Sequence, residues 1–363
     1  MTGMTSARDG GTPARTAAFG CAAVLLAVAL ALAALEVGVR LFSRQFHVFV
    51  PQYMIIDTAG ELFVRSDDPV LLYEMRPNVR TETLGLETRT NALGFRDRDY
   101  AVPKPRGVYR IAGVGDSIAF GLDMPLAQTY QKRIEARLNE RLHDRAYEVV
   151  NLGVPGYNMV QYYENLVRKG LRYEPDFVLL SYFPDDFFQP KIPRRWEYWR
   201  QLLEVHSHFY KWAHQRLRAV GSGRTGPGLS QFYGDEAALG EGKRALRKTW
   251  ELLHARGIGL YVVAHPTLED AYGLRPHLLG YVRDALAGTD TPILDLFPLY
   301  KATGRDIRSF RREASDFTHP SPEAAALIAD WVIQDWARRG FLGLDKGTKQ
   351  AHAPAGPVPV SVR

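Results

Sequence analysis

Beyond residue 105 the chain alternates between short apolar runs and longer amphipathic stretches, which restricts the fold more than any other feature. The apolar runs have the length and the β-branched content of buried strands, and the stretches between them show helical spacing. The runs are Tyr109–Val114, Tyr147–Leu152, Phe177–Tyr182, Ile258–Ala264 and Ile293–Phe297; the helical stretches are Pro125–Leu142, Val160–Leu171, Glu236–Ala255, Pro276–Ala287 and Pro322–Arg338. This order predicts a doubly wound, three-layer α/β fold of flavodoxin-like type, with a mainly parallel sheet flanked by helices.

The N-terminal region contains a second strong signal. From Thr16 to Val39 the residues are almost all apolar, with Glu36 as the one charged exception. About 20 apolar residues suffice to cross a bilayer as a helix, and a core helix of this length would show a polar stripe. We therefore expect a transmembrane anchor at 16–39, with a cleaved signal peptide as the alternative because small residues near its end resemble a cleavage site.

The orientation of this anchor depends on the flanking charges. Arg8 and Arg15 precede the run and Arg40 and Arg44 follow it, so the positive-inside rule has little asymmetry to act on. The short tail at 1–15 and the large domain that follows favour a cytoplasmic tail and a domain on the other side, in the periplasm or at the cell surface.

Three further segments depart from the alternating pattern. Residues 46–104 hold several prolines among short runs and predict an arm over a main domain at 105–342. Residues 187–233 interrupt that domain with an insertion rich in aromatic and basic residues. These aromatics favour either a stacking surface for a ligand or the packed underside of a cap. Residues 345–363 lack periodicity and predict a disordered tail.

Composition excludes several functions. The chain has 46 Lys and Arg against 40 Asp and Glu, a net charge of +6, but the basic residues are dispersed and accompany no nucleic-acid motif. A mildly basic surface fits an anionic membrane or glycan. The single cysteine, Cys21, allows no disulfide framework or cysteine-based metal site. We expect neither a metal ion nor a cofactor, and the protein partners remain open.

Two short motifs, far apart in the sequence, carry chemistry. Gly113–Ser117 ends the first apolar run in Gly-Asp-Ser, which places Ser117 at the tip of a strand, where hydrolases hold a nucleophile. Near the C-terminus, Asp316 lies three residues before His319, a spacing at which the carboxylate can orient and polarise the imidazole. Together they favour a serine esterase.

These motifs resemble those of the SGNH hydrolases, also called GDSL esterases, over roughly residues 88–338. Four pieces occur in the family's order: Gly115-Asp116-Ser117, Asn151-Leu152-Gly153, Phe183-Pro184-Asp185-Asp186 and Asp316-Phe317-Thr318-His319. The stretch Asn91–Asp97 is also similar to membrane-anchored bacterial members. The resemblance implies that Ser117 is the nucleophile, His319 the base and Asp316 its partner, and that the N–H groups of Ser117 and Gly153 face the oxyanion.

The chain departs from the family at the third piece. Members usually carry an Asn that donates to the oxyanion, and this chain has Asp185 there. An ionised carboxylate can only accept hydrogen bonds. Three interpretations stay open: Asp185 is protonated, Asp185 points away, or the domain only binds its ligand.

The function we expect is hydrolysis of an O-acyl ester outside the cytoplasm, on an acetylated envelope or secreted glycan. The alternatives are acyl transfer to a glycan through the same acyl-serine, and a catalytically inactive glycan-binding module. His265 follows the fourth apolar run and is a candidate substrate contact, with a structural role as the alternative.

Overall fold

The computed structural model describes residues 13–42, 62–83, 86–187, 207, 209–210, 213, 236–269, 275–313 and 316–344. Its contacts divide the chain into two units, Met1–Val50 with Ile192–Gly228 and Pro51–Lys191 with Leu229–Arg363, which we describe separately. Several predicted features lie outside the described residues: most of the 1–15 tail, the tail at 345–363, and the insertion aromatics Phe188, Trp196, Tyr198, Trp199 and Trp212. The domain boundaries stay predictions.

A five-stranded parallel sheet forms the centre of the larger unit and confirms the α/β prediction. Its strand order is β6-β5-β7-β8-β9. The strands are β5 (Val108–Val114), β6 (Ala146–Asn151), β7 (Phe177–Tyr182), β8 (Gly259–Ala264) and β9 (Ile293–Asp295). After β5 the chain goes to one side for β6 and to the other for β7, so the order reverses between β5 and β7. Ligands of such sheets bind beyond the carboxyl ends of the strands at this reversal.

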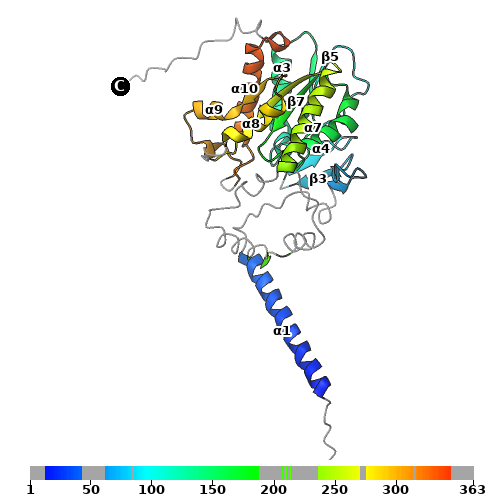
Figure 1. Ribbon diagram of the computed structural model, residues 1–363, viewed down its shortest axis with the longest axis vertical. Coiled ribbons are helices and arrows are strands. Elements are labelled where there is room, and N and C mark those ends of the chain that lie inside the picture. The colour runs from blue at the N-terminus through cyan, green and yellow to red at the C-terminus, as the bar shows by residue number, and fades with distance from the viewer. Residues whose placement is uncertain are drawn as a thin grey trace, which may run out of the picture. The chain divides into compact units, whose positions relative to one another are not determined.

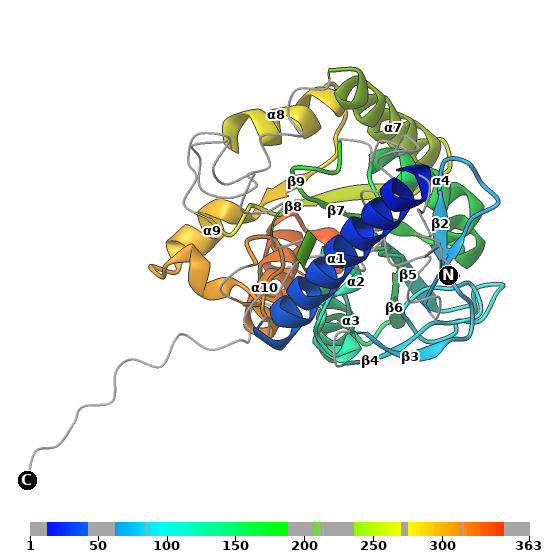
Figure 2. The same ribbon diagram turned by 90° about the horizontal axis from the view of Figure 1, so that it is seen from below.

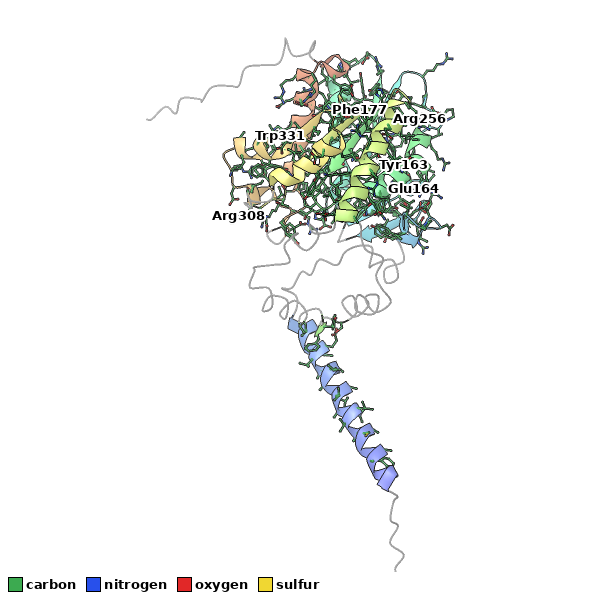
Figure 3. The ribbon with its side chains drawn as sticks, viewed as in Figure 1. Tyr163, Glu164, Phe177, Arg256, Arg308 and Trp331 are labelled. Atoms are coloured by element: carbon green, nitrogen blue, oxygen red, sulfur yellow. The ribbon has the colours of Figure 1, made fainter. Side chains whose placement is uncertain are left out.

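Helices cover both faces of the sheet, as Figures 1 and 2 show. One layer contains α4 (Met159–Arg168), α7 (Glu236–His254) and α8 (Arg275–Ala285), and the other contains α3 (Tyr130–Arg141), α9 (Leu296–Ala302) and α10 (Pro322–Arg338). Alternate side chains of β7 pack on opposite faces of the sheet. Val178 and Leu180 belong to the core under the first layer, and Phe177 and Leu179 belong to the core under the second. Phe177, labelled in Figure 3, packs edge-on against Trp336 of α10 with ring centroids 5.8 Å apart. Each face of the sheet therefore carries its own apolar core.

The residues before β5 form two antiparallel hairpins rather than helices. These are β1 (Phe63–Arg65) with β2 (Tyr73–Met75), and β3 (Arg80–Thr83) with β4 (Leu86–Arg89). The Tyr73 hydroxyl donates to the Pro155 carbonyl at 2.6 Å, and Phe95 is 1% exposed. The described part of the predicted arm, from residue 62 onward, therefore contributes to the core of this unit. Short 3-10 turns occur at Leu126–Gln128, Gly170–Tyr173 and Ile307–Phe310.

The smaller unit contains α1 (Pro13–Phe42), which includes the predicted anchor. Its apolar stretch Ala17–Val39 has a mean hydropathy of 2.6, and its large apolar side chains are exposed in the structure. At 1.5 Å per residue a helix of this length covers about 35 Å, enough for a bilayer core of about 30 Å. The apolar helix is thus present as predicted; anchor and signal peptide share these properties.

Candidate active site

Ser117 lies at the carboxyl end of β5, beside the reversal of strand order. It is the first residue of α2 (Ser117–Phe120), a single helical turn visible in Figure 2. Asp116 caps the turn, because its Oδ1 accepts the Ile118 N–H at 2.8 Å. Gly115 is required just before, since a Cβ there would lie 2.6 Å from two neighbouring side chains. The sequence thus holds the Ser117 hydroxyl at the tip of the strand.

Asp316 and His319 lie in the loop that leads into α10. Asp316 Oδ1 accepts the N–H groups of Thr318 at 2.9 Å and His319 at 3.0 Å, which closes the loop around the carboxylate. Its Oδ2 lies 2.8 Å from His319 Nδ1. Burial alone would raise the pKa of Asp316, but the hydrogen bonds and charge of His319 outweigh it and lower the pKa to about 2. Asp316 is therefore ionised at any working pH.

The structure brings the three predicted side chains into one hydrogen-bonded chain. His319 Nε2 lies 2.8 Å from Ser117 Oγ. Because the Asp316 carboxylate can only accept, the ring proton belongs on Nδ1, and Nε2 is free to accept the Ser117 proton. His319 is 2% exposed, whereas Ser117 is half-buried and open to an incoming substrate. This arrangement can activate a serine hydroxyl.

Three carboxyl groups gather beside Ser117. One oxygen of each of Asp116, Asp185 and Asp186 lies within 4.8 Å of the others. Burial, and then the charge of Asp116, raise the pKa of Asp185 to about 7; burial also raises the pKa of Asp116, and that of Asp186 well above its usual range. One Asp185 oxygen thus lies beside the carboxyl of Asp116, the residue next to Ser117.

The same spacing suits a hard cation such as Mg²⁺ or Ca²⁺. Two of the three carboxylates are already engaged by the backbone, however. Ile118 N–H donates to Asp116 Oδ1, and Phe183 N–H donates to Asp186 Oδ2 at 2.7 Å. Without a bound cation, adjacent buried carboxylates resist joint ionisation, and the pKa values of all three carboxyls are raised.

Gly153 does not fit the role that the resemblance implies. Its N–H donates to Asn151 Oδ1 at 2.9 Å, so the group expected to face an oxyanion is already occupied. The lack of a side chain serves packing instead, because a Cβ at Gly153 would lie 2.3 Å from the Phe120 nitrogen. Gly156, in the same loop, is exposed with a φ of 79°, and among the described residues no acceptor pairs with its N–H. In the sequence, the dipeptide Pro155-Gly156 indicates a turn at this position.

His265, the other histidine that the sequence singled out, is packed against an aromatic ring. It is 5% exposed, and its ring centroid is 5.6 Å from that of Tyr130. Burial lowers its pKa to about 3, so the ring is neutral. Within the described residues, no hydrogen bond or ion pair joins it to Ser117 or His319. This environment is that of a packed core histidine, and a substrate contact stays a prediction.

Sequence reasoning missed two arginines near the site. Arg312 Nε lies 3.0 Å from Asp316 Oδ2, and its guanidinium also contacts Asp123, in the loop after α2. Arg96 is 3% exposed and bonds to carbonyls of that same loop. In the sequence Arg312 looks like an ordinary basic residue, and Arg96 was noted only as part of the stretch Asn91–Asp97, without a role of its own.

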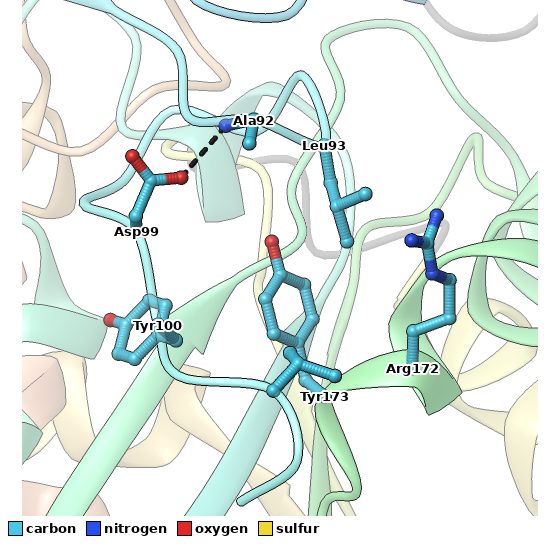
Figure 4. Close-up of a pocket in the computed structure, with 7 residues that line it drawn as sticks. Ala92, Leu93, Asp99, Tyr100, Arg172 and Tyr173 are labelled. Atoms are coloured by element: carbon cyan, nitrogen blue, oxygen red, sulfur yellow. Dashed lines mark hydrogen bonds between the residues drawn. The ribbon is translucent and has the colours of Figure 1, made fainter.

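A cavity of about 250 Å³ lies elsewhere, between the arm and the turn before β7 (Figure 4). It is lined by Ala92, Leu93, Asp99, Tyr100, Val102, Arg172 and Tyr173. Asp99 closes one side by accepting the Ala92 N–H at 2.8 Å. None of these residues belongs to the Ser117 site.

Comparisons with known proteins give similarities in solved structures alone. No family model and no curated protein matches the chain. Among solved structures, TesA is 16% identical over 63% of this chain and 98% of its own, with a TM-score of 0.40. An acetylxylan esterase from Geobacillus stearothermophilus, a catalytic mutant, is 14% identical (62% and 93% covered, TM-score 0.43). A two-domain esterase active on acetylated mannans is also 14% identical (70% and 54% covered, TM-score 0.41).

Proposed function

We propose that this protein is a serine-dependent hydrolase of O-acyl esters. The observation that carries the proposal is the hydrogen-bonded chain from Ser117 through His319 to Asp316, with both side-chain contacts at 2.8 Å. A serine beside an imidazole that is itself oriented by an ionised carboxylate is the arrangement that acyl transfer requires.

In the first half of the reaction, Ser117 Oγ bonds to the acyl carbon while its proton passes to His319 Nε2. The tetrahedral intermediate collapses when His319 gives that proton to the leaving alcohol oxygen and the ester C–O bond breaks. In the second half, water loses a proton to His319 and attacks the acyl-serine. The proton then returns to Ser117 Oγ as the free acid leaves. Asp316 stays ionised throughout and stabilises the imidazolium.

The oxyanion needs donors, and we propose the Ser117 N–H and the protonated carboxyl of Asp185. Burial, and then the charge of Asp116, favour the protonated form of Asp185 near neutral pH. An O–H in this place replaces the amide donor expected from the family. Gly156 is the candidate for a further backbone donor from its loop, in place of Gly153.

We propose that the substrate is an acylated glycan of the envelope or a secreted glycan. Support comes from the apolar helix α1, which would hold the domain at a membrane, and from the mildly basic composition, 46 Lys and Arg against 40 Asp and Glu. Acyl transfer to a glycan hydroxyl would use the same acyl-serine, with a sugar replacing water.

We also propose that α1 is a retained anchor with the catalytic domain outside the cytoplasm. Glu36, near the end of the apolar stretch, accepts hydrogen bonds from Ser207 Oγ at 2.8 Å and from the Phe209 N–H at 2.9 Å. This contact gives the helix a partner in the insertion, within the same unit. Removal of the helix as a signal peptide would leave that partner without its acceptor, so the contact supports retention.

Hydrolysis of a small acetyl ester by the full-length protein in detergent tests the proposed reaction. Ser117→Ala and His319→Ala should each reduce turnover to near the uncatalysed background, and Asp316→Asn should leave more activity, because the carboxylate alone contributes less. Ser309→Ala, at an exposed serine, is the matched control and should behave like the wild type. Unchanged turnover in Ser117→Ala would remove the serine mechanism and favour the glycan-binding alternative.

A further inference from the structure

The segment Asn91–Asp97 forms a tight buried turn whose shape is fixed by its own side chains. Asn91 Oδ1 accepts the N–H groups of Leu93 at 3.1 Å and Phe95 at 3.0 Å, and its amide donates to the Tyr173 hydroxyl at 3.1 Å. Gly94 has a φ of 84°, and a Cβ there would lie 2.2 Å from the Met75 carbonyl oxygen. The turn therefore presents Arg96 and Asp97 inward in one defined orientation.

Arg96 is held by backbone carbonyls instead of a carboxylate. Its Nη1 donates to the carbonyls of Phe120 at 3.1 Å and Gly121 at 2.6 Å, and its Nη2 donates to the carbonyl of Met124 at 2.7 Å. Its guanidinium carbon lies 4.9 Å from the centre of the Phe120 ring. Among the described residues no carboxylate forms an ion pair with it. Burial lowers its pKa to about 10, so Arg96 is still charged at neutral pH.

These three carbonyls belong to the chain that leaves Ser117. Phe120 ends α2, and Gly121 follows it with a φ of 77°. The Gly121 and Leu122 N–H groups in turn donate to the Ser117 carbonyl, each at 3.1 Å. The buried Arg96 guanidinium keeps its hydrogen bonds only if these carbonyls stay in position. Loss of the hydrogen bonds would be costly, because it would leave a buried charge without partners. Arg96 therefore fixes the path of the turn that begins at Ser117.

The next residue fixes the second loop of the site. Asp97 Oδ2 accepts the Asn151 N–H at 2.8 Å, and the Asn151 amide donates to the Phe120 carbonyl at 3.4 Å. The Phe120 carbonyl thus joins Arg96 to the 151–156 loop. Close packing of Gly153 against the Phe120 nitrogen makes the two loops depend on each other.

We propose that Arg96 is a positioning residue for the ester hydrolysis proposed above, on which this inference rests. It touches no reacting atom. It sets the position of the Ser117 N–H and hydroxyl groups relative to the 151–156 loop. Because misplacement of reacting groups by about 1 Å can cost about a hundredfold in rate, its removal should lower kcat and leave KM nearly unchanged.

The test compares two buried arginines in the full-length protein. Arg96→Ala should lower kcat for a small acetyl ester by about a hundredfold, and guanidinium added at low millimolar concentration should restore part of it by occupying the vacated site. Arg96→Lys should recover little, because one ammonium cannot reach carbonyls that a planar fork spans. Arg110→Ala is the matched control: Arg110 is 0% exposed and bonds to Glu148 Oε2 and the Tyr173 carbonyl. It lies on β5 four residues before the strand ends at Val114, which is about 13 Å along the strand at 3.3 Å per residue. The Arg110→Ala variant should lose stability but keep the kcat of the wild type, and added guanidinium should not change its rate.

Each outcome has one meaning. A kcat within twofold of the wild type in Arg96→Ala would overturn the proposal, as would equal loss and equal rescue in Arg110→Ala. If both Arg96 variants unfold at temperatures where Arg110→Ala is folded, Arg96 is a structural residue and the proposal is wrong. An inactive wild type that also fails to react with a serine-directed fluorophosphonate would instead refute the proposed hydrolysis.

Discussion

Replacing Asp185 with Asn changes a carboxyl that must be protonated into an amide that always donates. The pKa of Asp185 rises from 3.8 to about 7 through burial and the charge of Asp116. At about 1.4 kcal/mol per pKa unit, ionising it in the folded protein costs at most about 4 kcal/mol. Because the folded state holds this proton more tightly than the unfolded chain, wild-type stability should fall as pH rises from about 4 to 7. Asp185→Asn should lose this dependence.

Activity should separate the two proteins over a higher range of pH. Above pH 7 the protonated fraction of Asp185 falls about tenfold per pH unit, so the ratio of mutant to wild-type turnover should reach about ten at pH 8. Loss of one oxyanion donor lowers the rate by about a hundred- to thousandfold, and this factor is the largest value that the ratio of mutant to wild-type turnover can reach. His319 and Ser117 are common to both proteins, and the ratio therefore isolates Asp185.

The assay is the initial rate of acetyl ester hydrolysis from pH 5 to 9, with thermal unfolding followed at pH 5 and pH 8. Glu251→Gln, at an exposed carboxyl of α7, controls for a general effect of charge removal. Overlapping rate profiles for wild type and Asp185→Asn would refute the oxyanion role of Asp185. A mutant stabilised equally at both pH values would refute the raised pKa.

Three more predictions follow from other parts of the structure. Full-length protein should stay with membranes after alkaline and high-salt washing, because burial of apolar surface holds a spanning helix; release of a shortened soluble chain would show a cleaved signal. Gly153→Ala should lower both the thermal midpoint and kcat, since its Cβ would overlap the Phe120 nitrogen, whereas Gly280→Ala, with nothing within 4 Å, should be neutral or stabilising. A wild-type thermal midpoint in Gly153→Ala would contradict the packing argument. If the protein is a hydrolase, free acetate should remain the main product when an oligosaccharide is added to the assay. An acetylated oligosaccharide as the main product would establish the transferase alternative.

The sheet was predictable because its strands are largely apolar, and four of the five observed strands lie within one residue of their predicted ranges. The final strand departs further and ends two residues early. Ile293–Phe297 reads as one run, but Asp295 accepts the Phe297 N–H at 3.1 Å and begins α9 at Leu296. Similarly, the helix predicted from Pro125 begins only at Tyr130, where Thr129 provides the cap. Hydrophobic periodicity does not detect such local caps.

For the site, the sequence predicted what depends on short spacing. Asp316 and His319 are three residues apart and were predicted together, and the end of a strand placed Ser117 near them. Contacts between distant segments were not predictable. Arg96 bonds to carbonyls 24 to 28 residues away. Every residue has a backbone carbonyl, so the sequence does not show which of them a distant side chain contacts. The occupied N–H of Gly153 also depends on the rotamer of Asn151.

The central claim is that Ser117 is a nucleophile activated by His319, and covalent labelling tests it most directly. Full-length protein in detergent is treated with a fluorophosphonate, digested, and the adduct located by mass spectrometry. The account predicts a single adduct on Ser117 that is lost in His319→Ala and kept in Ser309→Ala. No adduct on folded protein, or an adduct on another residue, would contradict it.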